Sequence, residues 1–173
     1  MADWLRGAIG FALSSLLSAS ALADPIELLG QLDPVAGTDV YGDVWGEGDY
    51  AYLGVFSGTG VFIIDISDPA NPSLVTTYSP SSGQFKDVKV YDGIGYFATD
   101  DGDGLHIVDV SNPATPTLLA KIKAAQSGFN FVHNASKAGD YLYLADSVVG
   151  TIKVFDVSSP ASPVIRARHR YAG

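Results

Sequence analysis

The side chains in this sequence that are best suited to binding or catalysis are a histidine and an asparagine at neighbouring positions, His133 and Asn134. An imidazole can transfer a proton or ligate a metal near neutral pH, and an amide both donates and accepts hydrogen bonds. The 173 residues contain three histidines and no cysteine, so a thiol nucleophile and a two-histidine metal spacing are both absent from the sequence. We expect His133 and Asn134 to bind a ligand; a purely structural, hydrogen-bonded histidine is the alternative.

A second group of reactive side chains lies in the turn Asp-Asp-Gly-Asp-Gly. Its carboxylates, Asp100, Asp101 and Asp103, are hard oxygen ligands of the kind that bind Ca²⁺. The same pattern is typical of a hairpin turn, because Asp and Gly tolerate positive φ. A calcium loop of the EF-hand type starting at Asp101 would need an acid at its twelfth position, where Asn112 stands. Calcium is therefore one expectation for this turn and a hairpin without metal is the other; no other cofactor is expected.

The composition narrows the range of partners. Against 19 Asp and Glu the chain has 10 Lys and Arg, which gives a net charge of −9. Nucleic-acid binding depends on clustered cations, so no nucleic-acid partner is expected. The sequence also lacks a Gly-x-Ser-x-Gly nucleophile turn and a Gly-x-x-x-x-Gly-Lys phosphate loop. No catalytic residue is identified.

Residues 1–23 predict a signal peptide. Arg6 precedes an apolar run from Ala8 to Leu17, and Ala21-Leu22-Ala23 supplies small residues for cleavage before Asp24. The apolar run is shorter than the roughly 20 residues that a membrane span needs, so no transmembrane span is expected. We therefore expect a secreted, periplasmic or cell-surface protein; an N-terminal helix of the mature fold is the alternative interpretation of this segment.

An internal repeat organises the remainder of the chain. The sequences Ile-Ile-Asp-Ile-Ser, Ile-Val-Asp-Val-Ser and Val-Phe-Asp-Val-Ser are each followed by a Pro-Ala-x-Pro segment. Their central residues, Asp65, Asp109 and Asp156, are 44 and then 47 residues apart. This period predicts three units over about 33–78, 79–122 and 123–173. Because the aspartates recur in every unit, we expect them to cap the backbone N–H groups of the proline-containing loop, which is a structural role.

The sequence of each unit predicts four antiparallel strands. Short runs rich in Val, Ile, Tyr and Phe alternate with Gly- and Asp-containing turns, and no amphipathic helix is evident after Asp24. The strands predicted in the middle unit are 85–91, 95–99, 105–110 and 116–122. Four-stranded units at this period are typical of β-propeller blades, so the predicted fold class is all-β.

The repeated Asp-Val-Ser and Pro-Ala-x-Pro segments resemble the LVIVD repeat family of secreted or surface β-propeller proteins. The pair His133-Asn134 followed by Gly139-Asp140-Tyr141 resembles the choice-of-anchor B group, whose members carry differing C-terminal surface anchors. The resemblance implies an extracytoplasmic propeller and implies no defined enzymatic activity.

Three blades are fewer than a closed propeller usually has. Residues 24–32 resemble the last strand of the middle unit, which predicts an orphan outer strand that would complete the closing blade of a larger ring. We therefore expect further blades, either in a longer chain of which this sequence is the N-terminal part or by self-association of open arcs, for example two copies forming six blades.

Function is expected where the repeats differ, since a ligand in the channel needs different groups from different blades. Trp45, Lys89 and Ser136 share one inner-strand position, and Gly42, Lys86 and His133 share another. The expected ligand-binding residues are therefore Trp45, Lys89, His133 and Asn134, while His106 should face outward or a blade interface. We expect a scaffold that binds protein or carbohydrate at the cell surface; a propeller hydrolase, lactonase-like or lyase-like and possibly metal-dependent, is the alternative.

Overall fold

A computed structural model describes residues 26–34, 40–57, 60–80, 83–123, 128, 131–146 and 150–170. The expected signal peptide, residues 1–23, lies outside the described residues, as do residues 24 and 25. No helix among the described residues has the length and apolar character to cross a membrane.

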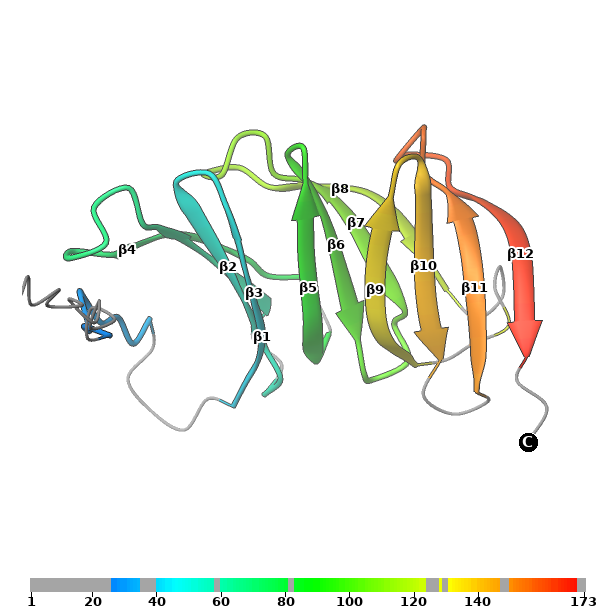
Figure 1. The fold of residues 1–173 in the computed structure, drawn as a ribbon, viewed down its shortest axis with the longest axis horizontal. Helices are drawn as coiled ribbons and strands as arrows, with labels where there is room; N and C mark the ends of the chain where they lie inside the picture. The colour runs from blue at the N-terminus through cyan, green and yellow to red at the C-terminus, as the bar shows by residue number, and fades with distance from the viewer. Residues whose placement is uncertain are drawn as a thin grey trace, which may run out of the picture.

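The described chain forms three separate four-stranded antiparallel sheets, each made of consecutive strands (Figure 1). Blade 1 contains β1 (Tyr41–Glu47), β2 (Tyr50–Val55), β3 (Gly60–Asp65) and β4 (Ser73–Tyr78); blade 2 contains β5 (Phe85–Tyr91), β6 (Ile94–Thr99), β7 (Leu105–Asp109) and β8 (Thr117–Ile122); blade 3 contains β9 (Val132–Ala138), β10 (Tyr141–Asp146), β11 (Thr151–Asp156) and β12 (Val164–Arg170). The strands predicted for the middle unit each agree with the observed ones to within one residue at either end, and the all-β propeller-blade class is confirmed.

Local sequence explains the sharp turns between strands. Asp92 and Gly93 form the two-residue connection between β5 and β6, and both have positive φ, 54° and 74°. Positive φ at both central positions is characteristic of the type I′ turn, whose twist matches that of the flanking strands. The Asp-Gly pair therefore fixes the register of the first hairpin of blade 2.

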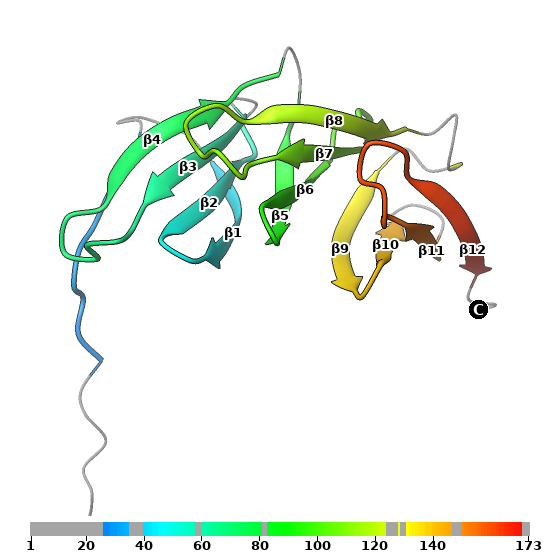
Figure 2. The ribbon, with the colours of Figure 1, turned by 90° about the horizontal axis from the view of Figure 1, so that it is seen from above.

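The three sheets stack face to face into an arc (Figure 2). The first strands, β1, β5 and β9, lie along the concave side, and the fourth strands, β4, β8 and β12, lie along the convex side. Apolar side chains fill the space between neighbouring blades: Tyr52 of blade 1 and Tyr96 of blade 2 are 3% and 1% exposed. Tyr143, at the same position in blade 3, is 41% exposed because no described blade covers it. The core of this fold thus lies between the blades.

The repeated aspartates sit at the ends of the third strands. Asp65 accepts hydrogen bonds from the backbone N–H and the hydroxyl of Ser67, at 2.8 and 2.6 Å. Asp109 and Asp156 accept the same pair of bonds from Ser111 and Ser158. These bonds lower the pKa of all three carboxyl groups, chiefly through the serine hydroxyls. Each aspartate therefore holds the start of its proline-containing loop.

Residues 26–34 pair with no described strand. Leu32 packs against Val55, Phe62 and Ile64 on the open side of blade 1. Asp33 accepts a hydrogen bond of 2.7 Å from the Tyr41 hydroxyl. The segment is thus anchored to blade 1 near Leu32, whereas Ile26 and Leu28 remain exposed.

Candidate functional site

An open pocket of about 410 Å³ lies on the concave side, where the first strands of the three blades run next to one another. Each blade contributes two neighbouring residues from the same repeat positions: Gly42 and Asp43 from β1, Lys86 and Asp87 from β5, and His133 and Asn134 from β9. Three different pairs at equivalent positions give the pocket a chemistry that no single repeat carries.

Gly42 allows β1 to approach β5 closely at this pocket. A Cβ atom added to Gly42 would lie 2.7 Å from the Phe85 carbonyl oxygen and 2.8 Å from the Lys86 Cα. Both distances are shorter than van der Waals contact, so a larger side chain would push the two strands apart. The absence of a side chain at this position therefore sets the spacing of the first two inner strands.

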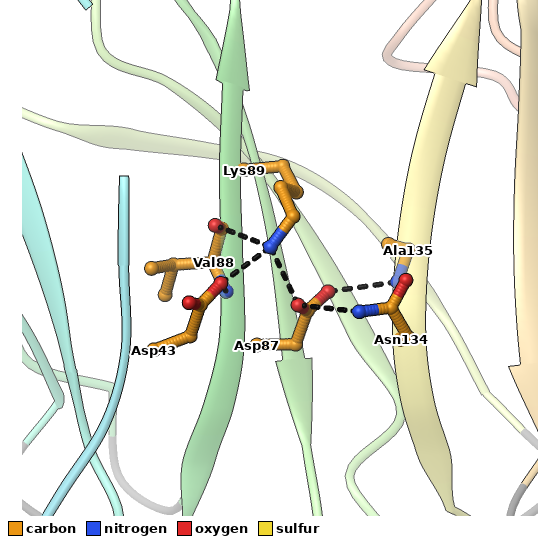
Figure 3. A network of polar contacts seen from close by, with 6 residues as sticks. All are labelled: Asp43, Asp87, Val88, Lys89, Asn134 and Ala135. Atoms are coloured by element: carbon orange, nitrogen blue, oxygen red, sulfur yellow. Dashed lines mark hydrogen bonds and ion pairs between the residues drawn. The ribbon is translucent and has the colours of Figure 1, made fainter. Parts of the chain in front are cut away.

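Aspartates at one repeat position join each inner strand to the next (Figure 3). Asp87 accepts hydrogen bonds from the backbone N–H of Ala135 at 2.7 Å and from the Asn134 amide at 3.0 Å. Asp43, the equivalent residue of blade 1, accepts a longer bond of 3.4 Å from the Val88 N–H. Since Val88 and Ala135 are also equivalent, the same contact between blades occurs twice.

Lys89 neutralises both aspartates. Its ammonium group forms ion pairs with Asp43 and with Asp87, the latter at 2.6 Å, and donates to the Val88 carbonyl at 3.2 Å. Burial lowers the pKa of Lys89, but the bonds to Asp43 and Asp87 outweigh burial and raise the pKa above its ordinary value. Lys89 therefore remains charged and holds two carboxylates of neighbouring blades together.

The four residues expected to bind a ligand occupy different places around this pocket. His133 and Asn134 line it, and the exposed His133 ring has no hydrogen-bond partner among the described residues. Lys89 lies next to the pocket through its ion pairs. Trp45 contacts Lys89, with the ammonium 5.3 Å from its ring, and packs against Tyr91 at the same ring-centre distance. The structure thus brings His133 and Asn134 into the pocket and leaves Trp45 beside it.

The three acids of the Asp-Asp-Gly-Asp-Gly turn contact other protein groups. Asp100 forms a 2.8 Å ion pair with Lys86, a pocket residue. Asp103 pairs with Lys121 at 2.6 Å and Lys123 at 2.9 Å. Asp101 accepts a bond from the Asp103 N–H at 3.2 Å. No group of three metal-binding side chains occurs within the described ranges.

His106 lies at the interface between blades 1 and 2, which decides between the two places the sequence left open. It is completely buried, with Nδ1 2.9 Å from the Tyr78 hydroxyl and Nε2 2.8 Å from an Asp103 oxygen. Burial lowers the pKa of His106, and burial also raises the pKa of Tyr78 to about 12. A neutral imidazole that donates to Asp103 and accepts from Tyr78 satisfies all three groups, so this buried network is structural.

Sequence reasoning missed Asp43 and Asp87 as site residues. They align with Asn134, and this alignment could have placed them beside it in the pocket. Their contacts to the next strand depend on the spacing between blades, which the alignment does not contain.

Consecutive four-stranded antiparallel sheets, stacked with their first strands along one concave side, define this chain as a β-propeller-type repeat protein. The family model for the LVIVD repeat matches residues 41–79, 82–123 and 134–169, which correspond to the three blades. The chain belongs to the LVIVD repeat family. No curated protein matches it.

Proposed function

We propose that this protein is an extracytoplasmic β-propeller that acts as a binding scaffold, with the pocket around His133 and Asn134 as its ligand site. The observation that carries the proposal is that the blades differ at the positions lining the pocket. Asp65, Asp109 and Asp156 repeat in every blade, whereas the equivalent pocket positions carry Gly42, Lys86 and His133. Variation between blades at an open concave site favours ligand recognition over blade maintenance.

The pocket suits a neutral ligand rich in hydroxyl groups. Asp43 and Asp87 offer acceptors, Lys86 offers donors, and the His133 ring and the Asn134 amide offer both. The nearby ammonium groups of Lys86 and Lys89 offset the carboxylates, so the site does not favour a highly charged ligand. Hydroxyl groups donate and accept in the same way, which makes carbohydrate the ligand class we propose.

The extracytoplasmic location rests on the N-terminal sequence. Residues 1–23 combine a basic residue, an apolar run and an Ala-x-Ala cleavage signal. The resemblance of His133-Asn134 and Gly139-Asp140-Tyr141 to the choice-of-anchor B group adds support for a cell-surface protein. Such a location would expose the concave pocket to external glycans.

Glycan binding tests this function directly. The chain starting at Asp24 is applied to an array of neutral oligosaccharides, and hits are measured by titration calorimetry. His133→Ala and Asn134→Ala should each weaken binding at least tenfold, because each removes groups that line the pocket. His169→Ala, the same change on the outer strand β12, is the matched control and should bind normally. Absence of any glycan binding, or equal losses in His133→Ala and His169→Ala, would overturn the proposal.

A further inference from the structure

The turn between the second and third strands carries acids in blade 2 and none in blade 3. In blade 2, residues 100–104 read Asp-Asp-Gly-Asp-Gly, whereas the equivalent residues 147–151 read Ser-Val-Val-Gly-Thr. The two segments have the same length, so Gly150 stands at the position of Asp103. Blade 3 therefore lacks the carboxyl group that blade 2 has at this position.

In blade 2, the Asp103 carboxylate is held by three nitrogen-bearing side chains. Its oxygens lie 2.8 Å from the Nε2 atom of His106, 2.6 Å from the Nζ atom of Lys121 and 2.9 Å from the Nζ atom of Lys123. Burial raises the pKa of Asp103, but the bonds from both lysines and the histidine outweigh burial and hold this pKa well below its usual range. These three positions together form a binding place for a carboxylate.

Blade 3 has cations at all three of these positions. The positions of His106, Lys121 and Lys123 are occupied by Lys153, Arg168 and Arg170, which we call the blade 3 cluster. The register is the same, because Lys153 pairs with Arg168 and the equivalent residues pair across β7 and β8. Blade 1 has the uncharged Phe62, Thr77 and Ser79 there, so the blade fold itself does not require cations at these positions.

The blade 3 cluster has more positive charge than its surroundings neutralise. Lys153 is 3% exposed and forms an ion pair of 3.2 Å with Asp146. Burial lowers the pKa of Lys153 and the nearby charge of Arg168 lowers it further, while Asp146 acts in the opposite direction. Arg168 and Arg170 are exposed and form no ion pair within the described part of the chain.

The surroundings of the blade 3 cluster also leave room for an added group. The cluster lies at the edge of blade 3 where β11 begins and β12 ends (Figure 1). A Cβ atom added to Gly150 would have no other atom within 4 Å, so the space beside this residue is open. The sequence between blades 2 and 3, residues 123–131, contains no acid that could supply a counter-charge.

We propose that Lys153, Arg168 and Arg170 bind a carboxylate group of an external ligand, in the place that the Asp103 side chain fills in blade 2. The two guanidinium groups can each donate paired hydrogen bonds to a planar carboxylate, and the buried ammonium group adds a fixed positive charge. Free sugar acids and the uronate units of acidic polysaccharides both present this group. The inference does not depend on the ligand proposed for the concave pocket.

Titration calorimetry at low ionic strength tests this site with two probes, glucuronate and a linear tetramer of galacturonate. The chain starting at Asp24 should bind at least one of them, and Arg168→Gln or Arg170→Gln should each weaken binding about tenfold through loss of charge-assisted hydrogen bonds. Arg166→Gln is the matched control on the same strand, since Arg166 already pairs with Asp156 at 2.9 Å, and it should bind normally.

The two probes also identify the source of the carboxylate. Tighter binding of the tetramer would support a polysaccharide ligand, and equal binding would support a free sugar acid; both results support the site. His133→Ala should leave both affinities unchanged, which separates this site from the concave pocket. Equally tight binding of inorganic sulfate would overturn the assignment to a carboxylate.

Substitution at Gly150 supplies the missing acid within the chain. Gly150 has a φ of +58°, a conformation that Asp and Asn tolerate better than other side chains, so Gly150→Asp and Gly150→Asn form a matched pair. Gly150→Asp should abolish probe binding and should have a higher urea midpoint than Gly150→Asn, because its carboxylate pairs with the blade 3 cluster. Gly150→Asn should bind as the natural chain does. Failure of the natural chain to bind either probe, or equal binding by the two Gly150 variants, would overturn the inference.

Discussion

Replacement of Asp87 by alanine should destabilise the protein more than replacement of any repeated loop aspartate. Asp87 is 4% exposed and accepts three hydrogen bonds: from the Ala135 N–H at 2.7 Å, from the Lys89 ammonium at 2.6 Å and from the Asn134 amide at 3.0 Å. Ala135 is fully buried, so water cannot replace the lost acceptor at its N–H group. An unsatisfied buried donor costs about 1–3 kcal/mol.

Loss of the hydrogen bonds from Lys89 and Asn134 should cost less unfolding free energy. Lys89 keeps its ion pair with Asp43 and its bond to the Val88 carbonyl, and Asn134 is exposed to water. Together these two contacts add about 1 kcal/mol. The expected loss in unfolding free energy for Asp87→Ala is therefore about 2–4 kcal/mol. Asp109→Ala removes bonds that are exposed to solvent, where water replaces the lost acceptor, so it should lower the unfolding free energy by less than Asp87→Ala does.

Urea unfolding followed by tryptophan fluorescence measures this difference. After removal of residues 1–23, Trp45 is the only tryptophan, and it contacts Lys89 directly, so its emission reports on the pocket region. Asp87→Asn keeps an acceptor for Ala135 but loses the charge beside Lys89, and its cost should lie between those of the two alanine variants. A loss for Asp87→Ala no larger than that for Asp109→Ala would refute the reasoning that the buried contact between blades carries the stability.

Three further predictions follow from other parts of the chain. N-terminal sequencing of exported protein should find Asp24 as the first residue, and a mature chain that begins at Met1 would contradict the signal-peptide interpretation. Gly104→Ala should lower the unfolding free energy by about 1–3 kcal/mol, because Gly104 has a φ of +88° and an added Cβ would lie 2.3 Å from the Ile122 carbonyl oxygen; an unchanged urea midpoint would count against this. Burial holds the pKa of His106 below 6.5, and Asp103, despite burial, has its pKa held below 3.8 by bonds from two lysines and His106. The unfolded chain then binds more protons in acid than the folded chain does, so urea midpoints should fall as the pH drops below about 6.5 and fall further below about 4. Asp103→Asn should flatten the dependence of the midpoint on pH below about 4. Midpoints independent of pH would contradict the pKa shifts of His106 and Asp103.

The blade itself was predictable because its determinants are local. Alternating apolar residues, the Asp92-Gly93 turn and the two prolines of each loop act within a few residues of one another, and the predicted strands of blade 2 agree with the structure. His106 could not be placed in this way. Its partner Tyr78 is 28 residues away in another blade, so the sequence indicated a strand position but not the interface that the ring faces.

The pocket shows where the limits of sequence reasoning lie. Comparison of the repeats singled out His133 and Asn134, and both line the pocket. The same comparison did not select Asp87, which is the same residue type as Asp43 at the equivalent position of blade 1. The structure shows that Asp87 holds the next strand and also faces the pocket, so a residue can serve both purposes when the contact between blades lies at the binding surface.

The repeat position occupied by Asp43 in blade 1 and Asp87 in blade 2 is Asn134 in blade 3, and this change affects how the inner strands are held together. Asp43 and Asp87 each accept an N–H from the next inner strand, but Asn134 donates its amide back to Asp87. The Asn134 side chain therefore belongs to both the pocket lining and the contact between β5 and β9. A ligand that competes for the Asn134 amide would loosen this contact, whereas one that binds its oxygen would leave the bond to Asp87 intact. Ligands of the second kind should bind more tightly, because they keep the spacing of the inner strands unchanged.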